Sequence, residues 1–444
     1  MGSGPLPKEV DSTIVERHER KGFRVGVAEM NGWRNNMEDA HLVHICGDWG
    51  FFGVFDGHGG EKCAKFVAPR LEKELRDKGC PPDDDAVRKI LFEVDQEFLD
   101  MEENSGSTAT MCIVHKPKDP GSPHKLRVIN AGDSRVLLGK INGHIVDGGG
   151  TDKGLTTDHK PDNEDEKERI IRCGGTVELA LGGILRVNGD LAVCRGFGDR
   201  TFKQTGGPGP EDRPVTVDPE LKRFDCNDTD FILLVCDGVS EGNFSNEEVV
   251  KLVSEELAKT KDPGAAARAV CHKAVATNSK DNISCMVVTL DGEKDVEKQI
   301  EFRSGSTLNL SEKKYYEAYK AMAERADLTV ADAIENRYKM LTTLLKSESS
   351  LTISDVKQAL GSCGDSEDGP PDLTDYKKEL EAMGEPDSEE RKEFLEKLEN
   401  GGLGNANQME DPMELLKRIT NLSDGSDKGA GKGGKGGYDS MDDL

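Results

Sequence analysis

Residues suited to metal chemistry stand where buried strands are expected to end. Asp56 follows the apolar run 51–55 and is followed directly by Gly57. A carboxylate at a strand end is a natural ligand for a hard divalent cation, and a glycine beside it lets the backbone come close. The Gly57 carbonyl offers a second oxygen of the same type. This arrangement predicts a cation site that contains Asp56.

Three further aspartates repeat the arrangement with small differences. Asp237 and Asp133 each follow an apolar run, at 231–236 and 126–130, whereas Asp281 stands just before a strand. Taken singly, an Asp-Gly pair is more often a turn than a ligand. Several such carboxylates in one domain favour the metal interpretation, because unpaired acids cannot gather without a cation to offset their repulsion.

Two other chemistries lack the residues they need. A thiolate phosphatase requires a cysteine followed by five residues and an arginine, and Cys63 and Arg70 are one residue too far apart. The sequence contains no G-x-x-x-x-G-K-[ST] loop for a nucleotide. A G-x-G-x-x-G spacing begins at Gly431, but it lies in a glycine-lysine segment with no strand before it, so composition explains it.

Composition and charge exclude several partners. With 85 Asp and Glu against 59 Lys and Arg, the 444-residue chain has a net charge of −26 and lacks the basic face of a nucleic-acid binder. Its most apolar stretch, 231–236, is far shorter than the roughly 20 residues of a membrane-spanning helix, and we find no export or lipidation signal. The 11 cysteines are odd in number and form no C-x-x-C pair, which indicates a reducing compartment. We expect a cytoplasmic or nuclear protein, or both, without nucleic-acid or membrane partners.

The elements that must position the aspartates fall in the first two thirds of the chain. Short β-branched runs alternate there with turns and with helical stretches at 61–78 and 85–102. This pattern predicts a mixed sheet-and-helix domain at 23–292 after an N-terminal arm at 1–22. Residues 293–444 carry 21 Lys or Arg and 34 Asp or Glu, a net of −13, the same as the 292 residues before them.

The last third of the chain has a helical pattern. Apolar residues recur at spacings of three and four, which predicts a helical extension at 300–422, and Thr329 with Asp332 suits a helix cap. Such stripes usually form core, so an appendage packed on the main domain or on itself is one interpretation, and a partner-binding helix is the other. Residues 423–444 are too poor in apolar side chains to offset the entropy of ordering, which predicts a disordered tail.

Eight segments between residues 23 and 290 together resemble the metal-dependent protein serine/threonine phosphatases of type 2C. The segments stand in the family's order and at plausible spacings over about three fifths of the chain. So many independent matches make chance agreement negligible. They are GWRNNMEDAH (32–41), FGVFDGHGG (52–60), SGSTAT (105–110), NAGDSR (130–135), DHKPDNEDEKERI (158–170), RVNGDLAVCRGFGD (186–199), LLVCDG (233–238) and SKDNISCMVV (279–288).

The resemblance implies an α+β fold, a four-layer α-β-β-α sandwich of two mainly antiparallel sheets flanked by helices, here with a C-terminal helical extension. It also implies two divalent ions, Mn²⁺ or Mg²⁺, in a cleft at one end of the sheets. Carried over by position, Asp56 bridges the two ions and the Gly57 carbonyl serves the second. Asp237 and Asp281 complete the first, and Glu38 holds a water bound to a metal.

Two residues receive catalytic roles from the resemblance. Arg34 would hold the substrate phosphate, since a planar guanidinium suits two phosphate oxygens. His58 would protonate the leaving oxygen, because its pKa can be tuned near the working pH. Each has a plainer interpretation, His58 as a histidine that caps a turn and Arg34 as an exposed arginine paired with a neighbouring acid. The sequence indicates no role for His41 or His159.

The sequence departs from the family after Asp237. The family usually continues with a bulky apolar residue, Trp and then Asp, whereas this chain has Val239, Ser240 and Glu241. In the family that Asp helps the acid at the position of Asp133 to hold a weaker third metal. A glutamate still coordinates a hard cation but has a different reach, so the departure could weaken turnover or shift the metal preference.

Three functions remain open, and the first is favoured because every position that contacts a metal directly is intact. It is hydrolysis of phosphoserine and phosphothreonine in proteins by a water bridging two divalent cations, without a covalent intermediate. The second is a pseudophosphatase or scaffold that binds phosphoproteins, suggested by Ser240, Glu241 and the acidic tail. The third is hydrolysis of a small-molecule phosphate. We expect a monomer that acts on phosphoproteins, with a further partner open to the C-terminal helices.

Overall fold

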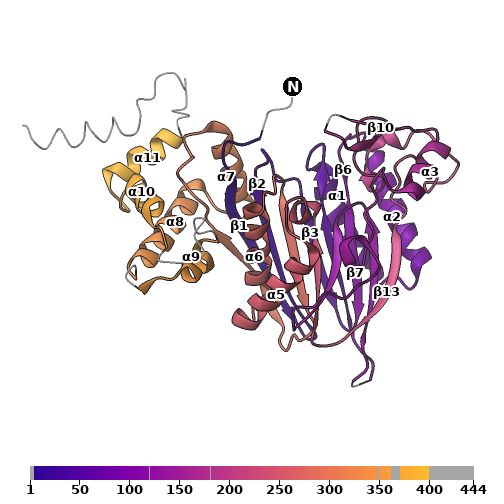
Figure 1. The fold of residues 1–444 in the computed structure, drawn as a ribbon, viewed down its shortest axis with the longest axis horizontal. Helices are drawn as coiled ribbons and strands as arrows, with labels where there is room; N and C mark the ends of the chain where they lie inside the picture. The colour runs from indigo at the N-terminus through magenta and orange to yellow at the C-terminus, as the bar shows by residue number, and fades with distance from the viewer. Residues whose placement is uncertain (1–4, 120, 181, 348–349, 362–370, 400–444) are drawn as a thin grey trace, which may run out of the picture.

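Two antiparallel sheets pack face to face at the centre of the molecule, and helices cover both outer faces (Figure 1). The computed structural model describes residues 5–119, 121–180, 182–347, 350–361 and 371–399. The predicted four-layer α-β-β-α sandwich is confirmed. None of the helices in these ranges is long and apolar enough to cross a membrane.

The first sheet has six strands, each antiparallel to its neighbours. Its central strands are buried almost throughout, because both of their faces are covered, and they are correspondingly rich in Val, Ile and Leu. In sheet order the strands are β16 (Val296–Arg303), β1 (Val10–Arg20), β2 (Phe23–Gly32), β15 (Ile283–Thr289), β14 (Asp230–Val235) and β9 (Arg135–Lys140).

Two of these strands lie outside the limits predicted from the sequence for the mixed sheet-and-helix domain, 23–292. The segment taken as an N-terminal arm contains β1, and β16 runs over the interval between residues 292 and 300. Ile14 of β1 stands opposite Glu29 of β2 on one side and Phe302 of β16 on the other. Pairing with the next strand, β2, places β1 in the sheet, and pairing with the distant β1 places β16 there. The division into domains otherwise stays a prediction.

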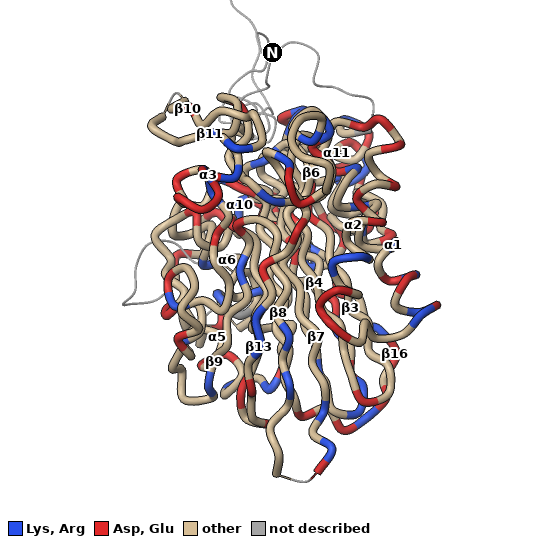
Figure 2. Tube along the Cα trace, turned by 90° about the vertical axis from the view of Figure 1, so that its right-hand side faces the viewer, with Lys and Arg blue, Asp and Glu red and all other residues tan. Residues whose placement is uncertain are grey.

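The second sheet has five strands, which Figure 2 shows side by side with smaller elements above one end. Phe52 and Val54 of this sheet pack with Ile232 and Leu234 of the first in the core between the sheets. The strand runs predicted from the sequence are confirmed in both sheets. In sheet order the strands are β13 (Glu220–Cys226), β8 (His124–Ala131), β7 (Ala109–His115), β4 (Trp49–Phe55) and β3 (Ala40–Cys46).

Two helices cover the outer face of each sheet. The helices α1 (Lys62–Lys78) and α2 (Asp84–Leu99) pack on the five-stranded sheet, which confirms the two helical stretches predicted there. On the six-stranded sheet lie α5 (Asn246–Thr260) and α6 (Pro263–Ala276). The N-terminus of α5 carries a capping box in which the Ser245 side chain accepts from the Glu248 N–H.

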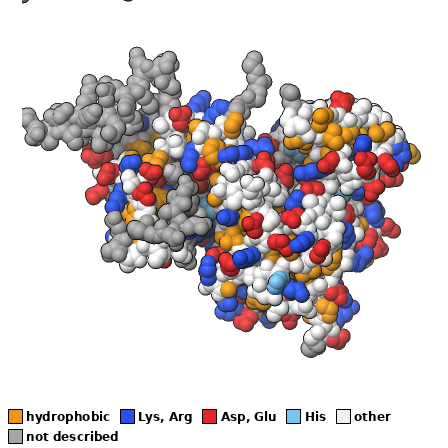
Figure 3. Space-filling view, viewed as in Figure 1, with side chains coloured by type: hydrophobic (Ala, Val, Ile, Leu, Met, Phe, Trp, Pro, Cys, Tyr) orange, Lys and Arg blue, Asp and Glu red, His pale blue; other side chains and the backbone are white. Residues whose placement is uncertain are grey.

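Short elements at one end of the sandwich surround the predicted site. Ile170, Val187 and Cys194 pack together in a small core at this end. In the hairpin beside it, Leu179 is 71% exposed and Ile184 is 53% exposed. Figure 3 shows apolar side chains gathered over this hairpin, at the upper right. The elements are β5 (Gly57–His58), β6 (Gly106–Ser107), β12 (Phe197–Gly198), α3 (Glu164–Arg172), α4 (Asp237–Ser240), the hairpin β10 (Val177–Leu179) and β11 (Leu185–Val187), and the short helices η1 (Thr151–Lys153) and η2 (Arg200–Phe202).

The described part of the C-terminal extension forms five helices, whose apolar faces pack on one another and on Val10 and Ile14 of β1. This agrees with the interpretation of an appendage packed on the main domain. The capping box predicted at Thr329 and Asp332 is confirmed. Residues 400–422 of the predicted extension and the tail predicted at 423–444 lie outside the described residues. The helices are α7 (Lys313–Arg325), α8 (Val330–Leu345), α9 (Ile353–Leu360), α10 (Thr374–Met383) and α11 (Glu389–Glu399).

Candidate active site

The four predicted aspartates meet at one end of the sandwich because of strand direction. In the second sheet β4 and β8 are both antiparallel to β7, so Asp56 and Asp133 follow strands that end at the same edge. In the first sheet β14 and β15 are antiparallel, so Asp237 at the end of one lies near Asp281 at the start of the other. With the buried Asp39, these residues form what we call the carboxylate cluster.

Burial and mutual repulsion dominate the electrostatics of the carboxylate cluster. Burial raises the pKa of Asp56 well above its usual value, and Asp39, Asp281 and Asp133 raise it further. Burial likewise raises the pKa of Asp237, with Asp56 as the strongest neighbouring charge. Like-charged buried groups of this kind are costly unless a positive charge offsets them.

Arg34 and Lys160 form ion pairs with acids of the cluster. Arg34 forms an ion pair with Asp281 through Nη2 and opposes the rise that burial causes in the pKa of Asp281. Lys160 Nζ lies 3.3 Å from Oδ2 of Asp133. The plainer interpretation of Arg34, pairing with a neighbouring acid in its own segment, is therefore replaced by a pair across the site. The Arg34 side chain is 54% exposed, so its other donors are accessible.

Glu38 and Gly57 lie against each other beside the cluster. A Cβ at position 57 would be 2.3 Å from the Glu38 carbonyl oxygen, so only glycine fits there. The Glu38 amide donates to Asn282 Oδ1 at 2.9 Å, and its Oε2 accepts from the Gly60 amide at 3.3 Å. The first of these bonds ties the segment that carries Glu38 to the residue after Asp281.

His58 has a partner that the sequence-based reasoning missed. Its Nε2 lies 2.8 and 2.9 Å from the two carboxylate oxygens of Asp199, which is buried. Burial alone would lower the pKa of His58, but the Asp199 carboxylate outweighs it and raises the pKa. A Cβ at Gly106 would come within 2.3 Å of both side chains, so this glycine makes room for the pair. Asp199 ends the quoted G-F-G-D segment, a strand-end aspartate like the others.

Asp39 is the second residue that the sequence-based reasoning left out. Burial, then Asp281 and Glu29, raise its pKa to about 8. One oxygen accepts from Ser284 Oγ at 2.7 Å, and the other, Oδ1, is buried without a hydrogen-bond partner among the described residues. The signal was in the sequence, since Asp39 directly follows Glu38 in the quoted M-E-D segment.

Glu241, predicted as a weak metal ligand, bonds to a loop of the protein. Its Oε2 accepts from the Lys280 amide at 2.9 Å and from Ser279 Oγ at 3.4 Å. These bonds place Glu241 beneath the loop that carries Asp281. Its role as a ligand stays a prediction, as does that of Asp133.

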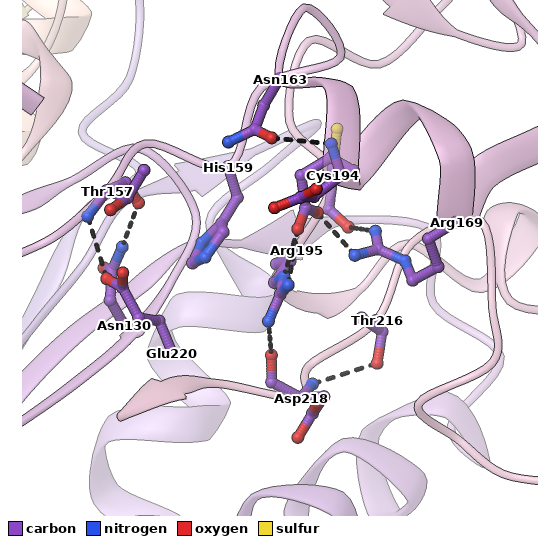
Figure 4. A network of polar contacts seen from close by, with 12 residues as sticks. Asn130, Thr157, His159, Asn163, Arg169, Cys194, Arg195, Thr216, Asp218 and Glu220 are labelled. Carbon is purple, nitrogen blue, oxygen red and sulfur yellow. Dashed lines mark hydrogen bonds and ion pairs between the residues drawn. The ribbon is translucent and has the colours of Figure 1, made fainter. Parts of the chain in front are cut away.

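Figure 4 shows a polar network around His159 and Arg195, and His159 also contacts the turn that precedes Asp133. Nδ1 of His159 lies 3.1 Å from the Gly132 amide, and burial followed by Arg195 lowers the pKa of His159 to about 4. A neutral ring can accept that amide proton. Arg195 in turn bonds Glu166 at 2.6 Å and the Asp218 carbonyl at 2.9 Å. His159 therefore contacts the backbone just before Asp133, a contact that the sequence did not indicate.

The oxygen donors of the carboxylate cluster fit divalent cations by charge. No three His, Cys, Asp or Glu side chains converge as ligands of one ion in the described part of the chain. The buried, mutually repelling carboxylates and the unpartnered Asp39 oxygen supply the hard oxygen donors that Mg²⁺ and Mn²⁺ take. Because such ions keep several waters, few protein ligands per ion suffice.

A groove of about 780 Å³ adjoins this end of the molecule. Glu38, Gly59 and Gly60 line one side, and Ala321 and Arg325 of α7 line another. The extension therefore reaches the surroundings of the candidate site.

Sequence comparisons identify relatives of the chain. The family model described as Protein phosphatase 2C matches residues 23–283. Protein phosphatase 1A of Homo sapiens is 33% identical over 311 residues, which cover 63% of this chain and 75% of that protein. Probable protein phosphatase 2C 4 of Paramecium tetraurelia is 34% identical over 261 residues, which cover 54% and 79%.

Solved structures show the same similarity. A phosphatase from a pathogenic strain of Toxoplasma gondii matches with a TM-score of 0.57 at 26% identity, over 66% of this chain and 99% of that one. A C. elegans sex determining protein matches with a TM-score of 0.51 at 27% identity, over 61% and 65%. The fold and these relatives define a protein serine/threonine phosphatase. The chain belongs to the protein phosphatase 2C family, as the eight sequence segments predicted.

Proposed function

We propose that this phosphatase hydrolyses phosphoserine and phosphothreonine in proteins at the carboxylate cluster, with two divalent cations, Mg²⁺ or Mn²⁺. The observation that carries the proposal is the gathering of Asp56, Asp237 and Asp281, whose buried charges repel one another. Such an arrangement is costly without cations, and the family supplies the reaction class.

The residues of the cluster divide the binding of the cations. Asp56, Asp237 and Asp281 would hold them, with the Gly57 carbonyl and Glu38 beside them. When bound, the two ions supply Lewis-acid stabilisation of the phosphoryl oxygens and lower the pKa of a bound water. Weaker ligation of a third ion is left to Asp133 and Glu241.

Arg34 orients the substrate phosphate in this proposal. Its pair with Asp281 uses Nη2, so the remaining guanidinium donors can bind two phosphate oxygens. The exposure of the side chain lets a protein-bound phosphate reach it. A substitution here is expected to raise KM more than it lowers kcat, because the interaction forms with the bound phosphate.

His58 holds the proton that the departing serine or threonine oxygen needs. Asp199 bonds Nε2 and favours the protonated ring, which leaves Nδ1 to donate to the leaving oxygen. The test compares Asp199→Asn with the wild type on a phosphoserine peptide and on an aryl phosphate. We expect a loss of about 10- to 100-fold on the peptide and little change on the aryl ester, whose leaving group needs no proton. Equal losses on both substrates would contradict this role.

The proposed activity is tested by phosphate release from a phosphothreonine peptide, with and without Mn²⁺. We expect turnover that requires the metal and is abolished by Asp281→Ala, whereas Asp225→Ala, at an exposed ion pair, leaves it unchanged. Metabolite phosphates are assayed in parallel. A higher kcat/KM on a metabolite would point to a small-molecule phosphatase, and phosphopeptide binding without turnover would point to a pseudophosphatase.

A further inference from the structure

The segment 33–39 carries three residues of the candidate site, and the helical extension holds it from outside the sandwich. Met37, between Arg34 and Glu38, is 2% exposed and belongs to the apolar core of the extension. Tyr319 and Met322 of α7 lie in the same core. The side chain in the middle of this segment is therefore packed by the extension.

Arg325, the last residue of α7, makes a polar contact with the same segment. Its Nη2 donates to the Asp39 carbonyl at 3.2 Å and to Glu29 Oε2 at 2.8 Å. Glu29 is buried in β2 and also bonds Nδ1 of His41 at 2.8 Å. A helix outside the family match is thus bonded to the backbone of a residue in the carboxylate cluster.

Arg325, which is half-buried, differs in position from the buried arginines of the extension. It lines the groove beside Glu38 and Gly60, whereas Arg391 bonds the Met383 and Gly384 carbonyls within the extension. The match to the family ends at residue 283, before α7 begins. Support for the segment 33–39 by α7 is therefore additional to what the sandwich of this family provides.

We propose that Arg325 is a positioning residue, which fixes the Asp39 carbonyl and with it the orientation of the segment 33–39 at the cation site. The extension then helps to position residues of the catalytic centre. The part of this proposal that concerns cations rests on the function proposed above. The part that concerns the segment itself does not, so the two can fail separately.

The first test measures hydrogen exchange of residues 33–41 in the full-length, metal-free protein. The variant Arg325→Met with Glu29→Gln removes the donor together with the carboxylate that it pairs with. We expect exchange in this segment to become roughly 3- to 10-fold faster, the effect of losing one hydrogen bond. Arg391→Met, the matched control, is expected to leave exchange there unchanged. Unchanged exchange in the double variant, or equal acceleration by the control, would overturn the proposal.

The second test titrates Mn²⁺ by calorimetry, so that its readout does not depend on turnover. We expect the double variant to bind Mn²⁺ roughly 3- to 10-fold more weakly, and Arg325→Lys, which keeps a donor, to recover most of the affinity. Equal affinity of wild type and double variant would overturn the positioning role. If the wild type binds Mn²⁺ without hydrolysing phosphopeptides, the proposed function fails, while the exchange measurement still decides the role of Arg325.

Discussion

Two groups of buried charge in this molecule are balanced in opposite ways. The carboxylate cluster gathers five acids, and burial and repulsion raise the pKa of Asp56 and Asp237. In the extension, the fully buried Arg337 pairs with Glu379 through two hydrogen bonds of 3.0 and 2.9 Å. There each charge has its partner within the chain.

The difference separates a candidate ligand site from a structural ion pair. A buried pair whose donors and acceptors are satisfied specifies how helices pack, and it needs nothing from solution. Uncompensated like charges instead lower stability until a ligand of opposite charge binds. Bound cations are therefore expected to stabilise the cluster by compensating its charge, as Arg337 already compensates the charge of Glu379.

Asp237→Asn is expected to have the largest effect on activity and the opposite effect on stability. Loss of a cation ligand should lower kcat/KM on a phosphopeptide roughly 10⁴-fold, equivalent to about 5 kcal/mol of barrier. In EDTA the same change removes one repelling charge, so the metal-free protein should unfold at a higher temperature. Phosphate release and thermal unfolding measure the two effects. If the variant unfolded at a lower temperature than the wild type in EDTA, the claim that neighbouring carboxylates repel Asp237 would be contradicted.

Arg337→Met tests the other half of the comparison. It leaves Glu379 buried without its partner and should lower the free energy of unfolding by about 3 to 5 kcal/mol. Replacing both residues, Arg337→Met with Glu379→Leu, should return most of that loss, because no lone charge remains. Urea denaturation of the three proteins gives the values. A double variant as unstable as the single one would mean that geometry, not charge, is decisive there.

The contact between sandwich and extension should depend on pH. His272 of α6 is buried against Gly361, and burial, then Arg268 and Arg337, lower its pKa to about 3. The unfolded chain binds the proton near pH 6.5, so the stabilisation is complete above that pH and is lost as the pH falls toward 3. At pH 5 we expect about 2 kcal/mol to be lost. Urea unfolding at pH 5 and above pH 6.5 measures the difference in the free energy of unfolding. His272→Gln should reduce this difference, whereas His144→Gln should leave it unchanged.

The smallest expected effect comes from the long-range field of the acidic chain. With a net charge of −26, the protein should associate faster with a phosphopeptide that has basic flanks. We expect kcat/KM for such a peptide to fall about two- to five-fold between about 20 and 200 mM salt, and to change less for a peptide with neutral flanks. Stopped assays at several salt concentrations measure it. A flat dependence for the basic peptide would count against steering.

Much of the fold could be predicted because its signals are local. Apolar runs, a capping box at Thr329 and strand-end aspartates are each readable within about ten residues, and the family segments gave their order. The edge strand β16 was not predicted, because its pairing with β1 joins segments almost 300 residues apart. Backbone hydrogen bonds between distant strands leave no mark in either strand alone.

The sequence by itself determined the class of enzyme, the layers of the sandwich and the aspartates suited to cations, since these follow from residue type and short spacing. Only the tertiary structure decided which groups stand beside them. It paired His58 with Asp199, joined Arg34 to Asp281, turned Glu241 to the 279–280 loop and brought Arg325 to the Asp39 carbonyl. Each of these contacts depends on distance and direction between residues far apart in the chain, which folding fixes and composition does not.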